Sequence, residues 1–191
     1  MKKHKQLLAL LLCLVMSISL FAGCGKKEEN QQPKQSTEQT DNKEVAETRE
    51  ITDMAGRKVT VPAAEKIESV FSSSPVSAIF LYMVAPDKLL GWNYELNDIE
   101  KSIILEKYHD LPNFGMGDAI NYEAVIAANP TIAVNCGKIN DAMISDCDAL
   151  SESLGIPVVA VDNELKNSAE AFRFMGELLG VEDHAEELAK Y

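Results

Sequence analysis

The sequence is poor in cysteine, histidine and positive charge, and each shortage excludes a class of protein. Four Cys and three His occur in 191 residues, which is too few for a disulfide scaffold. His109 and His184 are isolated, so there is no cluster of His, Cys and carboxylates of the kind a dedicated zinc or nickel site requires. The formal net charge of −12 disfavours nucleic-acid binding, because an anionic surface repels the phosphate backbone.

Motifs of catalysis are also absent from the sequence. It contains no Gly-x-Ser-x-Gly elbow, no P-loop, no HExxH zinc motif and no recognisable pairing of a nucleophile with a base. The sequence Gly115-Met116-Gly117 lacks the third glycine of a dinucleotide-binding fingerprint. We therefore predict that the protein is not an enzyme, and we keep an extracytoplasmic enzyme as the alternative class.

The first 23 residues have the pattern of an export signal. Three lysines precede a 15-residue apolar stretch, Leu7–Phe21, which is shorter than the roughly 20 residues of a membrane-spanning helix. The sequence LFAGC at 20–24 resembles the bacterial lipobox, with Phe21 where Leu is usual. We expect a lipoprotein signal peptide over 1–23 and acyl chains on Cys24 that anchor the protein to the outside of the cell membrane. The alternative is an ordinary cleaved signal in which Cys24 is incidental.

Residues 24–50 differ in composition from the rest of the chain. Gln, Glu, Lys, Thr and Asn dominate, and large apolar side chains are almost missing. Such a segment cannot bury enough surface to offset its conformational entropy, so we expect a disordered tether. Residues 51–191 carry 10 Lys and Arg against 23 Asp and Glu, a net charge of −13. The excess negative charge therefore lies on the folded part.

Strands and helices are expected to alternate from residue 51 onward. A hairpin at 51–62 turns at 55–57, and short apolar strands follow at 68–71, 89–92, 131–135 and 157–161. This order predicts an α/β fold, in which a Rossmann-like, mostly parallel sheet is covered by helices on both faces.

Capping residues and apolar spacing mark the helices between these strands. The expected N-terminal residues are Ser74, Asn97 or Asp98, Asn121, Asn140, Ser168, and Glu182 or Asp183. The second of these helices should run to about His109, with Ile99, Ile103 and Ile104 on its apolar face. Gly155 and Gly180 follow two helices at positions where glycine commonly ends a helix.

The carboxyl ends of the predicted strands carry small, polar and aromatic side chains. In open sheets of this kind a ligand binds at that edge. The segments expected there are Ser72–Ser74, Asn93–Tyr94, Gly115–Asp118, Asn135–Lys138 and Asp162–Asn163.

Four segments, in this order, resemble the periplasmic-binding-protein family that delivers iron chelates, haem or corrinoids to ABC importers. They are the hairpin ITDMAGRKVTVP (51–62), LPNFGMGDAINYEAVIAANPTIAV (111–134), LGIPVVAVD (154–162) and MGELLGVEDHAEELAKY (175–191). The sequence departs from the family in two places. Thr131 stands where Asp is usual, and the stretch 72–81 lacks a Thr-Glu pair that many members carry.

The resemblance implies one lobe of a two-lobed binding protein. Residues 51–181 match the N-terminal lobe and 182–191 the start of the helix that bridges the lobes, so we expect a truncated chain. The implied function is capture of a ferric-siderophore-type iron complex, with no permanently bound cofactor and no resident metal. The implied partners are an ABC permease of FecCD-like membrane subunits and its ATPase. A corrinoid or haem ligand is the alternative, as is a lobe that docks but has lost binding through truncation.

Two kinds of site residue follow from this reading. Glu123 lies in the first turn after Asn121, where a carboxylate complements the helix dipole; the resemblance implies that it pairs with arginines of the permease. The candidate ligand-binding residues are Ser73, Ser74, Trp92, Tyr94, Met116, Asn135 and Cys136.

Several of these candidates have an alternative reading. Core packing is an equal alternative for Trp92, whereas Tyr94 is expected to stack on a chelate or to offer a phenolate to ferric iron. Met116, like Asp118, fits a turn beside the cleft better than direct ligation. Cys136 and Cys147 form either a disulfide or two separately buried thiols.

Overall fold

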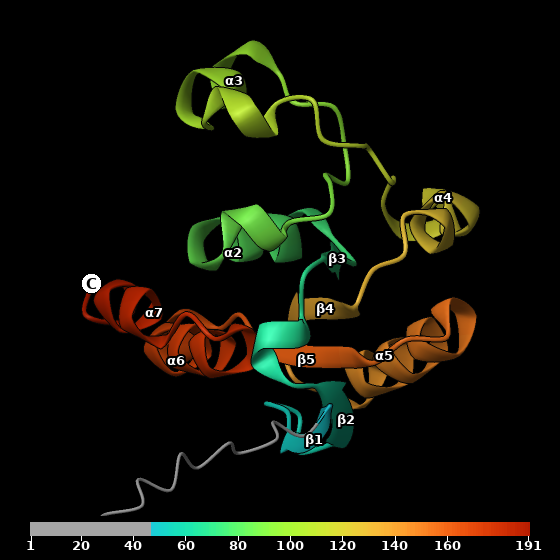
Figure 1. Ribbon diagram of the computed structural model, residues 1–191, viewed down its shortest axis with the longest axis vertical. Coiled ribbons are helices and arrows are strands. Elements are labelled where there is room, and N and C mark those ends of the chain that lie inside the picture. The colour runs from blue at the N-terminus through green and yellow to red at the C-terminus, as the bar shows by residue number, and fades with distance from the viewer. Residues whose placement is uncertain (1–46) are drawn as a thin grey trace, which may run out of the picture. The chain divides into compact units, whose positions relative to one another are not determined.

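The computed structural model describes residues 47–191, so the signal peptide, Cys24 and nearly all of the predicted tether lie outside the described residues. Figure 1 shows the order of the elements along the chain. Their bounds are β1 Thr48–Thr52, β2 Lys58–Pro62, β3 Val70–Ser72, α2 Pro75–Val84, α3 Asp98–Ile103, α4 Tyr122–Ala127, β4 Ile132–Gly137, α5 Asp141–Leu154, β5 Val158–Asp162, α6 Ser168–Leu179 and α7 Glu182–Ala189.

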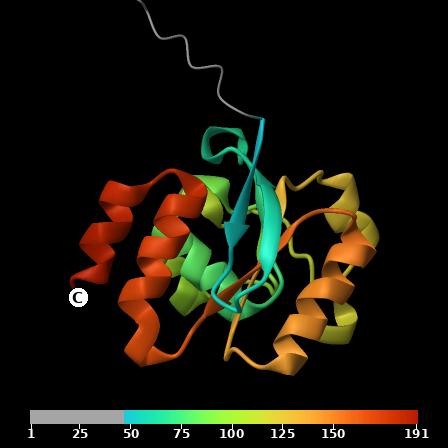
Figure 2. The same cartoon turned by 90° about the horizontal axis from the view of Figure 1, so that it is seen from below.

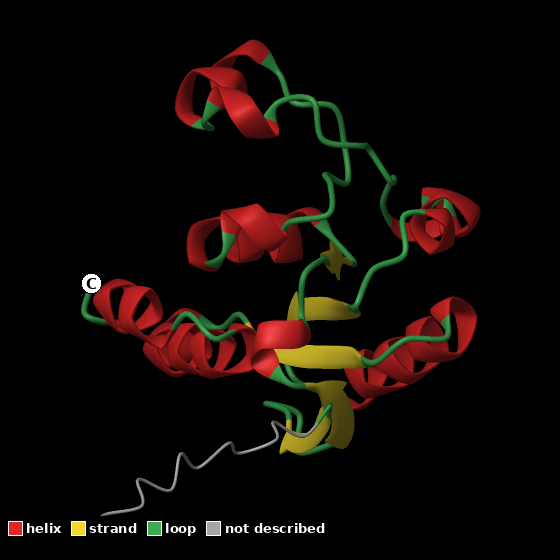
Figure 3. Cartoon of the chain, in the orientation of Figure 1, coloured by secondary structure: helices red, strands yellow, loops and turns green. Residues whose placement is uncertain are grey.

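A parallel sheet with the strand order β3-β4-β5 forms the centre of the fold. Val70 pairs with Ile132, and Val134 pairs with Val159. Helices α2, α6 and α7 lie on one side of this sheet and α4 and α5 on the other (Figure 3). The predicted α/β architecture, with a parallel sheet covered on both faces, is therefore confirmed.

The predicted strand at 89–92 is reduced to isolated bridges. Val70 bridges Leu89, and Trp92 bridges Asn113, both in the parallel sense. Alternate amides of this segment bond to different neighbours: Leu90 N–H donates to the Val70 carbonyl, and Trp92 N–H donates to that of Pro112. The segment thus extends the sheet edge without forming a continuous ladder with one partner.

Side chains of the sheet alternate strictly between two buried clusters, as the pleat of a strand requires. In β4, Ile132, Val134 and Cys136 join the cluster on the α2 and α6 side, whereas Ala133 joins the cluster on the α4 and α5 side. Because both faces are covered, the residues of these strands are apolar and buried except toward their carboxyl ends, where Ser72, Asn135 and Asp162 are polar.

The predicted hairpin is confirmed and is fixed to the sheet by a buried carboxylate. Asp53 accepts hydrogen bonds from the backbone N–H groups of Ala55 and Arg57, which close the turn. It also accepts from the backbone N–H of Ala160 in β5 at 3.1 Å and from Arg57 Nε at 3.0 Å. The hairpin turn is therefore tied to the middle of β5.

Two arginines extend this anchoring to the helices on either side. Arg57 donates to Asp148 of α5 at 2.6 Å and to the Val158 carbonyl. Arg49 of β1 donates to the carbonyls of Glu177 and Leu178, at the end of α6. Figure 2 shows the hairpin between these two helices. Since β1 begins at Thr48, the folded lobe starts before the predicted boundary at residue 51.

The second predicted helix, α3, is shorter than expected. Asn97 and Glu100 form a capping box, so the helix begins as predicted, but α3 ends at Ile103. Ile104 has ψ of 138°, and this extended backbone breaks the helix before a short 3-10 turn at 106–108. Ile99 and Ile103 are consequently 74% and 75% exposed, whereas Ile104 is buried. The prediction that Ile99 and Ile103 lie on a buried apolar face is therefore wrong.

Most other predicted helix ends agree with the structure. Ser74, Asn121 and Asn140 accept capping hydrogen bonds, and Gly155 and Gly180 end their helices with φ of 69° and 71°. Ser168 is the exception, because it is the first residue of α6 and its hydroxyl donates to the Leu165 carbonyl instead of capping the helix. The last helix begins at Glu182, as predicted, and its final helical residue is Ala189.

None of the helices between residues 47 and 191 has both the length and the apolar character needed to span a bilayer.

Replacing Asp53 by Ala should destabilise the lobe markedly. The change removes a buried carboxylate and leaves Arg57 without its main partner, so we expect the free energy of unfolding to fall by about 3 kcal/mol. Urea denaturation followed by circular dichroism measures the loss. Glu50→Ala is the matched control, because the Glu50–Lys58 ion pair is exposed and should contribute under about 1 kcal/mol. Equal losses in the two variants would contradict the anchoring role of Asp53.

Candidate functional site

The polar residues predicted at strand ends gather along one edge of the sheet. Because β3, β4 and β5 are parallel, their carboxyl ends and the loops that follow lie at the same edge. The bridges of segment 89–92 bring the loop after it, and the loop at 115–118, to this edge as well. In folds of this type that edge is where ligands bind.

Ser73 and Asn135 connect the ends of β3 and β4. The Ser73 hydroxyl donates to Asn135 Oδ1 at 2.8 Å, and Asn135 Nδ2 lies 3.6 Å from Cys147 Sγ of α5. The side-chain amide is therefore held at both ends, which fixes its orientation. Both residues remain only partly buried, so their free hydrogen-bonding capacity faces the outside.

A buried hydroxyl of α2 supports these groups from below. Ser77 Oγ accepts a hydrogen bond from the backbone N–H of Cys136 at 2.9 Å and lies 2.8 Å from Ser74 Oγ. It also lies 3.4 Å from Ser73 Oγ. Ser74 in turn caps α2 by accepting from the Ser77 N–H. The three hydroxyls form one connected group that ties the start of α2 to β4.

On the other side of β3, a buried asparagine connects the end of this strand to the loop at 115–118. Asn93 is 2% exposed, and its Nδ2 donates to the carbonyls of Ser72 and Gly115 at 2.9 and 3.1 Å. Ser72 Oγ donates back to Asn93 Oδ1. Gly115 has φ of +77°, and a Cβ there would collide with the Ala119 carbonyl, so the tight loop requires glycine.

The connected polar groups border a depression of about 420 Å³. It extends from the strand ends toward α5, and α4 contributes Tyr122. The lining residues are Ser73, Ser74, Gly117, Asp118, Ile120, Tyr122, Asn135, Asp146, Ala149, Leu150 and Ser153. They offer hydroxyls, an amide and two carboxylates, which is a lining suited to binding a polar molecule.

Nothing in this lining forms a catalytic pair. The serines bond to one another and to Asn135, and no histidine or lysine contributes to the depression. Among residues 47–191 there is also no group of three His, Cys, Asp or Glu side chains that could hold a metal ion.

No family model matches the sequence, and no curated protein matches it either. Solved structures do. An ABC transporter solute-binding protein from Sulfurospirillum deleyianum has a TM-score of 0.62 and 23% identity, over 74% of this chain and 45% of that one. The TroA-like periplasmic binding protein FepB from Veillonella parvula has a TM-score of 0.54 and 26% identity, over 74% of this chain and 45% of that one. Staphylococcus aureus SirA, solved with staphyloferrin B, has a TM-score of 0.55 and 22% identity, over 75% of this chain and 46% of that one.

The chain has the fold of one lobe of an ABC-transporter solute-binding protein. It spans less than half the length of these solved structures. The first two of these neighbours are described as binding proteins.

Three of the predicted ligand residues lie at the depression. Ser73, Ser74 and Asn135 line it, together with Asp118. Met116 is half-exposed and directly precedes the lining residue Gly117. Contact between these residues and a ligand remains a prediction.

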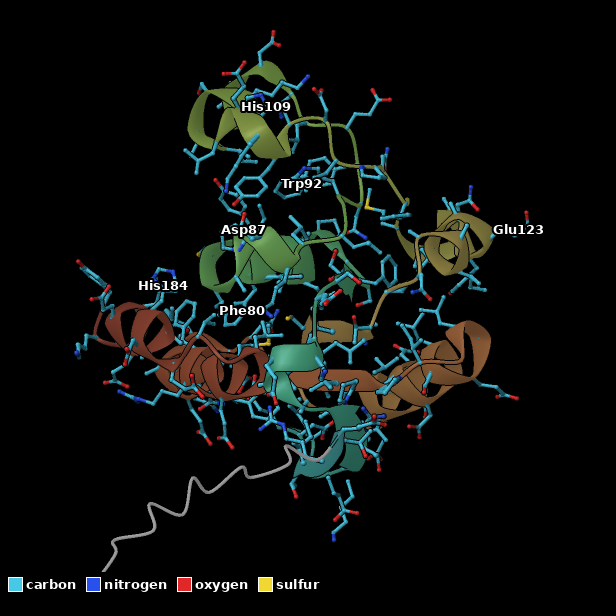
Figure 4. The ribbon with its side chains drawn as sticks, viewed as in Figure 1. Phe80, Asp87, Trp92, His109, Glu123 and His184 are labelled. Atoms are coloured by element: carbon cyan, nitrogen blue, oxygen red, sulfur yellow. The ribbon has the colours of Figure 1, made fainter. Side chains whose placement is uncertain are left out.

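The predicted ligand contact of Trp92 is wrong, and its alternative, core packing, describes the structure. The side chain is 1% exposed, and Nε1 donates to the Tyr108 carbonyl at 2.8 Å. Its ring lies 5.8 Å from that of Tyr82, and Trp92 is labelled in Figure 4. Trp92 therefore packs in the core cluster, and the polar contacts at the end of this segment come from the next residue, Asn93.

Tyr94 is placed near the edge, but its hydroxyl is already engaged. The phenol donates to Glu100 Oε1 at 2.9 Å. Partial burial and this hydrogen bond raise the pKa of Tyr94 above its usual value, so the neutral phenol is favoured. The predicted phenolate ligand for ferric iron is therefore not supported, and the ring packs against the core cluster on the α2 side.

Cys136 and Cys147 are separate, buried thiols, so the disulfide alternative is excluded. The pleat explains this result, because Cys136 faces α2 and Ser77, whereas Cys147 lies in the cluster on the α5 side. Burial raises the pKa of the Cys136 thiol to about 12. The predicted ligand contact of Cys136 is wrong for the same reason, since its side chain faces the core.

The remaining predicted residues lie at the surface. Glu123 is exposed on α4 and points away from the lobe in Figure 4, so its position is compatible with docking, which stays a prediction. His109 Nε2 is 2.7 Å from the Ile104 carbonyl, and His184 Nε2 is 3.0 Å from that of Met83. Both imidazoles support backbone segments rather than the depression.

Two important residues were missed in the sequence, Ser77 and Asn93. A serine at the third position of an apolar helix is an available signal for Ser77, because the remaining α2 side chains are nearly all apolar. Asn93 directly follows Trp92, and the sequence marks it only as a residue at a strand end. Asp146 and Tyr122 line the depression from helices, and only the packing of α4 and α5 brings them there.

The two thiols of the lobe should resist modification in the folded protein. In a Cys13→Ser, Cys24→Ser background, we expect Ellman's reagent at pH 8 to label neither Cys136 nor Cys147, because both are buried and the raised pKa of each disfavours the thiolate. Unfolding in guanidinium should expose two reactive thiols per chain. Introducing Ser145→Cys on the exposed face of α5 provides a control that should label at once. An absence of reactive thiols after unfolding would indicate a disulfide and contradict the assignment.

Proposed function

We propose that the protein is the extracytoplasmic solute-binding component of an ABC importer, and that it captures a ferric-siderophore-type iron complex for a membrane permease. The observation that supports this best is the polar depression at the carboxyl edge of a solute-binding lobe. Its hydroxyls and amide are held by buried hydrogen bonds, so they are ordered before a ligand arrives. No pairing of nucleophile and base accompanies them, which favours binding without catalysis.

A lipid anchor on Cys24 belongs to the same proposal. Acylation would hold the lobe at the outer surface of the cell membrane, where the permease and its ATPase operate. The segment between Cys24 and β1 would then set how far the lobe reaches. Radiolabelled palmitate incorporated by wild type and not by Cys24→Ser is the direct measurement.

The described residues favour a preformed chelate over a bare metal ion, because none of them form a group of three His, Cys, Asp or Glu side chains that could hold one. Structural neighbours are described as binding molybdate or haem as well as staphyloferrin B, so the fold alone does not select the ligand. In this lobe the phenol of Tyr94 is bonded to Glu100, and both histidines bond to backbone carbonyls. The edge thus offers mainly hydrogen-bonding groups. Tyr122 and Met116 also lie there and are of types that can ligate iron, so haem and corrinoids remain the alternatives to test.

Binding of ferric chelates tests the proposal directly. The full chain, purified in a mild non-ionic detergent, is titrated by calorimetry with ferric siderophores, haemin and cobalamin. We expect saturable binding of a ferric siderophore and weaker or no binding of the other two. Asn135→Ala should reduce the affinity about tenfold, because two directed hydrogen-bonding groups are lost. Preference for haemin or cobalamin would replace the proposed ligand, and binding of none would contradict the transport function.

Glu123 is proposed to dock against basic residues of the permease. It is exposed in the first turn of α4, and the acidic lobe would be attracted to a positive surface. Glu123→Ala should reduce iron uptake by cells severalfold and leave the affinity for the chelate unchanged. Glu65→Ala is the control, because Glu65 is exposed at the opposite edge, before β3. A parallel loss of chelate affinity would contradict a docking role.

A further inference from the structure

The strand-end depression carries negative but no positive charge. Its two ionisable carboxylates are Asp118, from the loop before α4, and Asp146 of α5, and no lysine or arginine contributes to its lining. The other lining groups that hydrogen-bond are uncharged hydroxyls and the Asn135 amide. A bound anion would therefore meet carboxylates without a compensating cation from this lobe, which is electrostatically unfavourable.

Two lysines follow the strands that end at this edge, Lys138 after β4 and Lys166 after β5, and neither lines the depression beside its two carboxylates. Lys166 is paired with Glu164, Nζ to Oε2 at 2.9 Å. Lys138 follows β4 and is exposed, and it lines neither this depression nor the neighbouring groove. The lobe as a whole carries 10 basic against 23 acidic residues from residue 51 onward, so the long-range field also repels anions.

An apolar groove of about 440 Å³ adjoins the depression at the start of α2. Ser74 lines the depression, and the next residue, Pro75, lines the groove. Exposed Val76, Ile79 and Met83 form one wall. The opposite wall comes from α6, where Phe172 stacks on Phe80 with ring centroids 4.7 Å apart. Asn163, directly after β5, completes this wall at the same edge of the sheet.

We propose that the ligand of this lobe is a neutral or cationic chelate with an apolar portion, of the trihydroxamate type, and that polycarboxylate iron chelates are rejected. This inference rests on the proposed function and specifies the class of its ligand. The polar, metal-bearing part occupies the depression, where hydroxyls and the Asn135 amide meet its oxygens and the two carboxylates attract its charge. The aliphatic part lies in the groove against Val76, Ile79 and Phe172, where removing apolar surface from water favours binding.

Three probes of different charge test the proposal on the full chain. Ferrioxamine B is a cationic trihydroxamate, ferrichrome is a neutral one, and ferric citrate is an anionic carboxylate. In calorimetric titrations at low salt we expect both trihydroxamates to bind at least about tenfold more tightly than ferric citrate, with the preference for the cation decreasing as salt is added. Val76→Asp combined with Ile79→Asp should weaken ferrichrome binding through the groove.

Charge reversal separates the role of the depression from general charge. Asp118→Lys combined with Asp146→Lys should raise the affinity for ferric citrate and lower that for ferrioxamine B, each about tenfold. Glu65→Lys combined with Glu68→Lys makes the same change in net charge before β3, at the opposite edge, and should move neither affinity by more than about twofold. Circular dichroism verifies that each variant is folded.

Different outcomes would overturn the inferred ligand class and the proposed function. Tightest binding of ferric citrate by wild type, or equal responses of the two double reversals, would overturn the inference and leave the solute-binding function intact. Binding of none of the three chelates, together with none of haemin and cobalamin, would overturn the proposed function as well.

Discussion

The parallel pairing of β3, β4 and β5 is the constraint on which the rest of the structure depends. Parallel strands must be covered on both faces, and this places α2, α6 and α7 on one side and α4 and α5 on the other. The same pairing directs every strand end to one edge, where Ser73 bonds to Asn135 and Asn93 bonds to the end of β3. Site and core are therefore products of one arrangement, and the hairpin anchored through Asp53 fixes the last strand of that sheet.

Buried polar groups give the edge its rigidity. A hydroxyl or amide removed from water is unfavourable unless it is hydrogen-bonded, and Ser77 and Asn93 satisfy that condition by bonding to three different segments of the chain. The exposed groups above them are thus oriented by a buried layer. A lobe of this kind can present ordered hydrogen-bonding groups before the ligand binds, which reduces the entropic cost of binding.

The sequence predicted the elements of the fold well, because their signals are local. Capping by Ser74, Asn121 and Asn140, and the glycines that end α5 and α6, were found where the pattern placed them. Local patterns failed where long-range packing decides. Ile99 and Ile103 have helical spacing but no neighbour to cover them, and Trp92 is drawn into the core although its position in the chain adjoins the edge.

What the sequence alone determined is the class of the fold, the acidic character of the lobe and the set of strand ends at which a ligand would bind. These properties follow from the period of apolar residues, from composition and from turn chemistry, all of which are local. Only the tertiary structure decided which of the candidates face outward. The pleat of β4 separates Cys136 from Cys147, the Tyr94 hydroxyl donates a hydrogen bond to Glu100, and Asp146 lines the depression from α5. These relations connect residues far apart in the chain, and the packing of helices on the sheet sets them.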